Sequence, residues 1–139
     1  MQFYRMPDEC SHDLVDFRFE PHYVKIDNGH GVELPMQDVD EGPKNAPIIL
    51  SADGQPIWSY SFRKMIPPLV AAGYRVIAPD IVGFGRSDKP DNPLDDTFAA
   101  RVKWMHDFVR PESLSDINLV CQDWGGPKAL SVFAADIYR

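Results

Sequence analysis

The chain has 139 residues, of which 44% are apolar and 12% aromatic, which suffices for a buried core and excludes disorder throughout. The formal net charge of −7 at pH 7 argues against a nucleic-acid partner, because phosphate binding needs clustered Lys and Arg. Residues 1–20 lack the apolar segment of a signal peptide, no stretch is apolar enough to span a membrane, and Cys10 and Cys121 lie in unrelated contexts. We therefore expect a cytoplasmic protein without disulfides that acts on a small neutral molecule.

Two segments near the N-terminus, residues 22–27 and 32–39, alternate apolar and polar side chains as strands do. The Gly-rich residues 28–31 between them predict a hairpin-like turn. Because Pro35 has no backbone N–H, we expect the second strand to be irregular or to lie at an edge of the sheet.

A buried strand and a helix follow along the chain. Residues 47–52 form a short apolar run typical of a buried strand, which ends in a loop at 53–56. Residues 58–72 predict a helix that the prolines at 67–68 kink or split, and Gly73 closes it. Its apolar residues at helical spacing are Phe62, Met65, Ile66, Leu69 and Val70.

The rest of the chain continues this alternation. Residues 74–80 and 117–121 predict buried strands, and residues 83–90 predict a tight loop that lacks the spacing of a phosphate-binding loop. Residues 97–109 and 126–138 predict helices. The faces expected to point inward carry Phe98, Val102, Met105 and Val109 in the first helix and Leu130, Phe133, Ala134 and Ile137 in the second.

This order of strands and helices predicts an α/β protein with a mostly parallel sheet and helices on both faces. Functional groups in such sheets gather at the carboxyl ends of the strands. Two predicted loops with an acidic residue leave those ends, at residues 53–56 and 122–126. We therefore expect the functional site there.

The second loop has the layout of a nucleophile elbow. Asp123 lies at the predicted strand-to-helix turn, and Gly125 and Gly126 follow directly, so that strand and helix can approach closely. Cys121 stands where the usual pattern has its first Gly. An Asp before two glycines is also typical of a plain turn or a helix N-cap, so this motif alone leaves both interpretations open.

Three motifs together resemble the haloalkane dehalogenase family in order and spacing. They are Gly-Gln-Pro-x-Trp-Ser-Tyr at 54–60, Ala-Pro-Asp-x-x-Gly-Phe-Gly-Arg-Ser-Asp-Lys-Pro at 78–90, and Cys-Gln-Asp-Trp-Gly-Gly at 121–126. Residues 5–9, 21–24 and 39–43 extend the resemblance over nearly all of the chain. It implies an α/β-hydrolase fold, with residues 1–139 as the N-terminal portion of the core domain, truncated after the elbow helix.

The resemblance also implies a reaction. Asp123 would displace halide from a saturated carbon, and water would hydrolyse the resulting alkyl ester to an alcohol. The indole N–H of Trp124 would bind the halide, and the backbone N–H groups of Gln55 and Trp124 would form the oxyanion hole. The implied partners are a small halogenated or epoxide substrate and water, with no metal, no cofactor and no identifiable protein partner. Trp124 by itself could also be an aromatic core residue.

Two features depart from the family pattern. Asp53 stands where the family has His, and a carboxylate about 6 Å from Asp123 would repel it by on the order of 3 kcal/mol at an effective dielectric constant of about 20. If Asp53 points inward, we expect Asp53→His to raise turnover. The family is also considerably longer, so we expect the cap, the triad acid and the water-activating His outside residues 1–139, and this chain alone to be inactive.

Two alternatives stay open. An epoxide hydrolase uses the same Asp elbow, although Gln55 and Gln122 favour the dehalogenase. The other is a non-catalytic fragment of a disrupted gene, which Asp53 and the short chain favour. The four histidines, His12, His22, His30 and His106, all precede Asp123, whereas the base follows the nucleophile in this fold.

Overall fold

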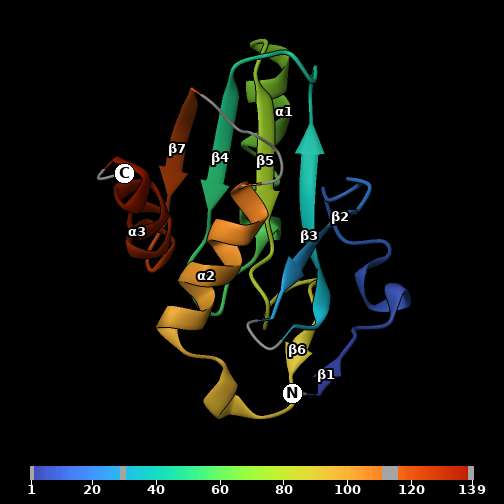
Figure 1. The fold of residues 1–139 in the computed structure, drawn as a ribbon. Coiled ribbons are helices and arrows are strands. Elements are labelled where there is room, and N and C mark those ends of the chain that lie inside the picture. Colours follow the sequence, from blue (N-terminus) through green and yellow to red (C-terminus); the bar gives the residue numbers. More distant parts are fainter. Residues whose placement is uncertain (1, 29–30, 111–115, 138–139) are drawn as a thin grey trace.

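The computed structural model describes residues 2–28, 31–110 and 116–137, with side chains as far as Ala134 (Figure 1). The strands are β1 (Phe3–Tyr4), β2 (His22–Asp27), β3 (Glu33–Glu41), β4 (Ile48–Ala52), β5 (Arg75–Pro79), β6 (Lys89–Pro90) and β7 (Ile117–Cys121). The α-helices are α1 (Ile66–Ala71), α2 (Phe98–Val109) and α3 (Gly125–Ile137), and the 3-10 helices are η1 (Asp8–Ser11), η2 (Ser59–Phe62) and η3 (Pro93–Asp95).

The main sheet has the strand order β2-β3-β5-β4-β7, and β1 pairs separately with β6. Strands β5, β4 and β7 are parallel, so their carboxyl ends meet at one edge (Figure 1). Strand β3 is antiparallel to both β2 and β5. The α/β class is confirmed, but in the described residues the sheet is mixed rather than mostly parallel, because β2 and β3 add two antiparallel strands.

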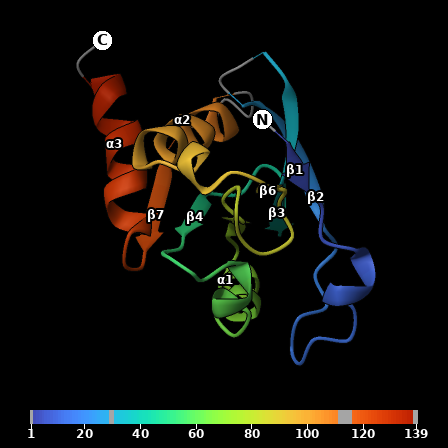
Figure 2. The ribbon, with the colours of Figure 1, turned by 90° about the horizontal axis from the view of Figure 1, so that it is seen from below.

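Helices cover both faces of the sheet, as predicted: α1 lies on one face, and α2 and α3 lie on the other (Figure 2). Neighbouring residues of one strand serve the two faces, because side chains alternate along a strand. In β4, Leu50 packs into the core under α2 and α3, whereas Ile49 packs into the core around α1. This two-sided burial explains the uninterrupted apolar runs of the central strands.

The expected edge position of the strand with Pro35 is wrong, because β3 lies between β2 and β5. Pro35 pairs with Lys25 of β2, whereas pairing with β5 involves only Asp38 to Glu41. The proline therefore lies in the part of β3 that has one neighbour, where a missing N–H is tolerated. The turn predicted at 28–31 falls partly on Gly29 and His30, which lie outside the described residues.

Strand β7 matches its predicted bounds but not its predicted burial. Asn118 and Cys121 are exposed, and Ile117 is only half-buried. The reason is that β4 is the one partner of β7 in the described part of the sheet. Its second side is therefore open to solvent.

The predicted helix at 58–72 is split, as expected, into η2 and α1. The prolines at 67–68 do not break it, however, but lie in the first turn of α1, where a missing N–H leaves no hydrogen bond unmade. Gly73, with φ of 94°, follows the helix in the left-handed conformation typical of a helix end. The predicted apolar face is also only partly right, because Met65 is exposed.

The predicted inward faces of the last two helices are wrong in part. Helix α2 buries Met105 and Val109 as predicted, but it exposes Phe98 and also buries Arg101, Trp104 and Phe108. Helix α3 exposes Leu130 and instead buries Lys128, Ala129 and Val132. These two helices pack against each other as well as against the sheet, so contact with two neighbours decides their orientation. The side chain of Ile137 and all of Tyr138 lie outside the described residues.

Among the residues that the structure describes, we find no helix with the length and apolarity that a membrane crossing requires.

Candidate functional site

Asp123 occupies the turn between β7 and α3, at the carboxyl edge of the parallel strands. Its φ of 50° lies in the left-handed region, which Asp tolerates better than most residues. The turn is fastened by hydrogen bonds from the Gln122 N–H to the Ala52 carbonyl at 3.1 Å and from the Gly125 N–H to the Gln122 carbonyl at 2.9 Å. This geometry leaves the Asp123 residue exposed at the apex of a sharp strand-to-helix turn.

Two glycines around Asp123 have no room for a side chain. A Cβ on Gly54 would lie 2.6 Å from the Asp123 Cβ, and a Cβ on Gly125 would lie 2.6 Å from the Ala52 carbonyl carbon. By contrast, a Cβ on Gly126 would make an ordinary contact of 3.7 Å with the Cβ of Cys121. Close approach of the loop and the helix to the elbow therefore requires glycine at 54 and 125.

Two backbone N–H groups act on the Asp123 carboxylate. The Gln55 N–H donates to Asp123 Oδ2 at 3.3 Å. Hydrogen bonding from the Trp124 backbone N–H, followed by that from Gln55, lowers the pKa of Asp123 below its ordinary value. The carboxylate is therefore ionised at neutral pH.

The Trp124 side chain is exposed rather than buried in the core. It is 52% exposed, and its ring meets the ring of Phe98 edge to face at 5.9 Å between centroids. An exposed indole can offer its N–H to an anion in solution. The structure thus brings together the three residues predicted from the sequence, namely Gln55, Asp123 and Trp124.

Asp53 is buried, with 5% of its surface exposed. Its carboxylate accepts hydrogen bonds from the Gly54 N–H at 2.8 Å and from the Ser61 hydroxyl. Both bonds hold the carboxylate to its own loop and to η2, and neither involves Asp123. Behind this loop lies the fully buried Lys128, whose Nζ donates to the Asp53 carbonyl at 3.1 Å.

Asp80 organises the neighbouring loop. Its fully buried carboxylate accepts the Ser59 N–H and the Arg86 N–H, each at 2.8 Å. Gly85 is required beside it, because a Cβ there would come within 2.5 Å of the Asp80 Cγ. The loop glycines serve backbone geometry, as predicted, and Asp80 ties this loop to the segment that begins η2.

Asp80 should make stability fall as the pH rises. Burial raises the pKa of Asp80 from 3.8 to about 6. Between these values the folded chain holds a proton that the unfolded chain has released, so the free energy of unfolding decreases by on the order of 3 kcal/mol as the pH rises from below 4 to above 6. Urea unfolding of the wild type and of Asp80→Asn at pH 4 and pH 7 measures this decrease. The Asp80→Asn variant should lack the part of the decrease that Asp80 causes. An equal change in the free energy of unfolding in both proteins would contradict the prediction.

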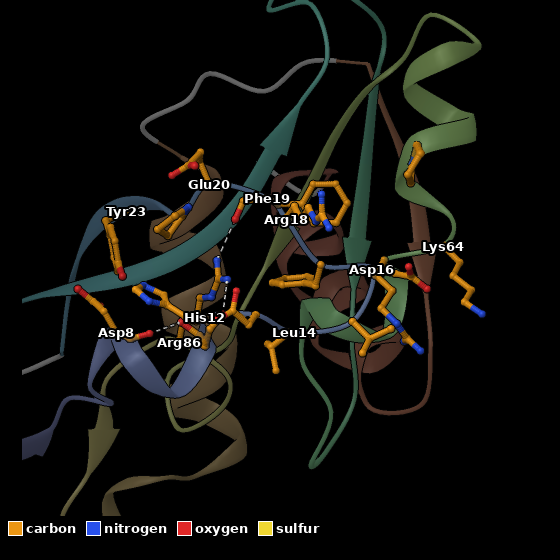
Figure 3. Close-up of a pocket in the computed structure, with 17 residues that line it drawn as sticks. Asp8, His12, Leu14, Asp16, Arg18, Phe19, Glu20, Tyr23, Lys64 and Arg86 are labelled. Atoms are coloured by element: carbon orange, nitrogen blue, oxygen red, sulfur yellow. Dashed lines mark hydrogen bonds between the residues drawn. The ribbon is translucent and has the colours of Figure 1, made fainter.

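A cavity of about 1400 Å³ lies away from Asp123, which is not among its lining residues. It is lined by residues 11–21 together with Arg63, Lys64 and Arg86, and Figure 3 shows Arg86 and Lys64 well apart along it. Arg86 holds this segment by donating to the carbonyls of Phe19 at 3.2 Å and Ser11 at 3.4 Å. The elbow, by contrast, lies on an open surface in the described structure.

The described histidines lie elsewhere. His12 and His22 line other hollows of the surface, and the His106 ring contacts Asp107 at 3.3 Å. Within the described residues no hydrogen bond joins a histidine to Asp123, and no group of His, Cys, Asp and Glu has the arrangement of a metal site.

The profile of the family described as alpha/beta hydrolase fold matches residues 47–136, which include the three parallel strands and the elbow. The chain belongs to the α/β-hydrolase fold family. This family uses the elbow at the end of a parallel strand to present its nucleophile. Asp123 lies at such a turn, between β7 and α3.

Comparison with individual relatives indicates a narrower group of similar proteins than the fold family. The chain is 46% identical over 134 residues to a haloalkane dehalogenase of Psychrobacter cryohalolentis and 43% identical over 134 residues to one of Mycobacterium marinum. Each alignment covers 96% of this chain but only 44% and 45% of the relatives, so the chain spans less than half of their length.

Solved structures give the same picture. The haloalkane dehalogenase DpaA of Paraglaciecola agarilytica superposes with a TM-score of 0.89 at 39% identity, over 97% of this chain and 45% of that chain. An epoxide hydrolase of Vigna radiata superposes with a TM-score of 0.69 at 26% identity, over 81% of this chain and 34% of that chain. The resemblance to haloalkane dehalogenases inferred from the motifs is therefore confirmed.

The sequence interpretation did not assign a role to two residues of the site region, Lys128 and Asp80. A lysine inside an otherwise apolar helix was a usable signal for Lys128, because such a residue is either exposed or paired. Asp80 belongs to the motif at 78–90, but its role was not evident there, since its partners Ser59 and Arg86 come from two different segments.

Proposed function

We propose that the protein to which this chain contributes hydrolyses carbon–halogen bonds of small haloalkanes, with Asp123 as the nucleophile. The observation that carries the proposal is an ionised, exposed carboxylate at an elbow apex, with the N–H groups of Gln55 and Trp124 directed at it. The identity of 41–46% to haloalkane dehalogenases supports this activity.

The proposed reaction has two steps. In the first, an Asp123 oxygen attacks the halogen-bearing carbon, so that a carbon–oxygen bond forms and the halide leaves with the bonding electrons. In the second, water adds to the ester carbonyl carbon, one of its protons leaves with the alkoxy group as the alcohol, the other is released to solvent, and the carboxylate is restored. The exposed indole of Trp124 suits binding of the departing halide, and the two N–H groups suit the oxyanion of the second step.

We infer that the base that activates the water lies outside residues 1–139. Within the described residues no histidine hydrogen-bonds to Asp123, and the relatives are more than twice as long as their matched portion. This chain by itself is then expected to be alkylated once and not to turn over.

Mass spectrometry of the chain after incubation with a short 1-bromoalkane tests this proposal. We expect the mass of one alkyl group on the peptide that contains Asp123, accompanied by one equivalent of bromide. Because thiolates also react with bromoalkanes, the experiment uses a Cys10→Ser, Cys121→Ser background. Absence of the adduct from the folded chain would contradict the proposal, and sustained bromide release would contradict the expected single turnover.

A terminal epoxide tests the alternative enzyme activity on the same elbow. Opening of an epoxide by Asp123 gives a hydroxyalkyl ester instead of an alkyl ester. The chain is 26% identical to an epoxide hydrolase but 46% identical to a haloalkane dehalogenase. The comparison therefore favours dehalogenation over epoxide hydrolysis. Faster labelling of Asp123 by the epoxide than by the bromoalkane would favour the epoxide hydrolase activity over the dehalogenase activity. A folded chain inert to both probes would support a non-catalytic fragment.

A further inference from the structure

Lys128 is a lysine with no exposed surface, on the helix that begins at the elbow. Its neighbours on the buried face of α3 are Ala129 and Val132, which cannot stabilise an ammonium group. The Nζ donates to the Asp53 carbonyl at 3.1 Å. A buried cation with such neighbours needs a compensating charge nearby.

Charged groups lie on two sides of Lys128, toward α2 and toward the elbow. On the side of α2, Arg101 is bound to Asp96 by two hydrogen bonds of 2.5 Å, so this cation is already paired. On the side of the elbow lie Asp53 and Asp123, both of which favour a charged Lys128. Lys128 is therefore the cation available to these two carboxylates.

The lysine also controls a loop position. The Asp53 carbonyl precedes the Gln55 N–H by two residues, and that N–H donates to Asp123. The Asp53 carboxylate anchors the other side of the same loop through Gly54 and Ser61. Lys128 thus fastens the loop to α3, the helix whose first turn follows Asp123.

We propose that Lys128 is a positioning residue that holds the Asp53 loop, residues 53–56, against the elbow and offsets the Asp53 charge. The Gln55 N–H then stays directed at Asp123 despite a carboxylate where dehalogenases were expected to carry His. This role rests on the proposed function of Asp123 as nucleophile.

The test is the rate of Asp123 alkylation by a 1-bromoalkane between pH 6 and 10, in the background without cysteines. Burial, with a smaller contribution from Arg101, lowers the pKa of Lys128 to about 8, while Asp53, Asp123 and Asp96 oppose this shift. We therefore expect the wild-type rate to decline as the pH rises through 8. Lys128→Met should be slower at pH 7, on the order of tenfold, without that decline.

Two further variants make the test specific. Lys103→Met removes a partly exposed lysine of α2 that pairs with Asp107, and it should behave as wild type. Lys128→Arg keeps the positive charge, so it should retain the wild-type rate of Asp123 alkylation at pH 7 and lose the decline above pH 8. This variant replaces Lys128→Met in the test if Lys128→Met does not fold. An unchanged decline in either Lys128 variant would overturn the proposal.

Hydrogen exchange separates this proposal from the proposed function. Exchange of the Gln55 amide should be roughly tenfold faster in Lys128→Met than in Lys103→Met, while amides within β4 stay unchanged. This result would support the positioning role even if no variant, wild type included, were alkylated. Equal exchange of the Gln55 amide in both variants would overturn it.

Discussion

Replacement of Asp123 by Asn is expected to abolish alkylation by bromoalkanes, with a loss of at least about a thousandfold. The amide oxygen is a far weaker nucleophile than the carboxylate, yet Asn accepts the left-handed backbone conformation at φ of 50° and can still accept the Gln55 N–H. The fold should therefore persist. Mass spectrometry of the elbow peptide measures the adduct, and chemical unfolding measures stability.

A matched control exists on the same strand. Asp116 is also exposed and has φ of 55°, directly before β7. Asp116→Asn makes the same chemical change in the same backbone conformation, away from Gln55 and Trp124. This control should be alkylated as the wild type is; equal adduct formation in Asp123→Asn would show that another residue reacts.

Gly125→Ala is expected to destabilise the fold by about 3 kcal/mol. A Cβ there would lie 2.6 Å from the Ala52 carbonyl carbon, so α3 would have to move away from β4. Movement of α3 also shifts the Trp124 N–H, so alkylation of Asp123 should slow as well. Urea unfolding monitored by circular dichroism measures the first effect.

Gly126→Ala is the control for this change, one residue further along the same helix. A Cβ at this position makes only an ordinary contact of 3.7 Å with Cys121, and Ala is a better helix former than Gly. We expect stability within about 1 kcal/mol of wild type. Similar destabilisation by both substitutions would contradict contact with Ala52 as the cause of the Gly125→Ala effect.

The two carboxylates at the ends of parallel strands have different roles in this structure. Asp123 is exposed and accepts hydrogen bonds from the backbone N–H groups of Gln55 and Trp124. Asp53 is buried and accepts hydrogen bonds from Gly54 and Ser61. The repulsion expected between them assumed that Asp53 points at Asp123. The hydrogen bonds of Asp53 instead direct it elsewhere, so Asp53→His is expected to disturb the loop rather than simply raise turnover.

Much of the local structure could be predicted from the sequence. Strands β2 and β7 have the predicted bounds, because alternation and apolar runs are properties of adjacent residues. The elbow at 121–126 was recognisable for the same reason, since the spacing of Asp and Gly within one turn is local. The α/β-hydrolase fold expected from these motifs is confirmed by the profile match.

The orientation of the helices and the surroundings of the site were decided by tertiary structure. Leu130 was expected inside and Lys128 was overlooked, because the inner face of α3 depends on its contacts with α2 and β4. The approach of Gln55 to Asp123 and the bond from Lys128 to Asp53 both join segments distant along the chain. Sequence periodicity specifies which residues share a face, but only packing against remote segments determines which face is buried and which polar groups meet there.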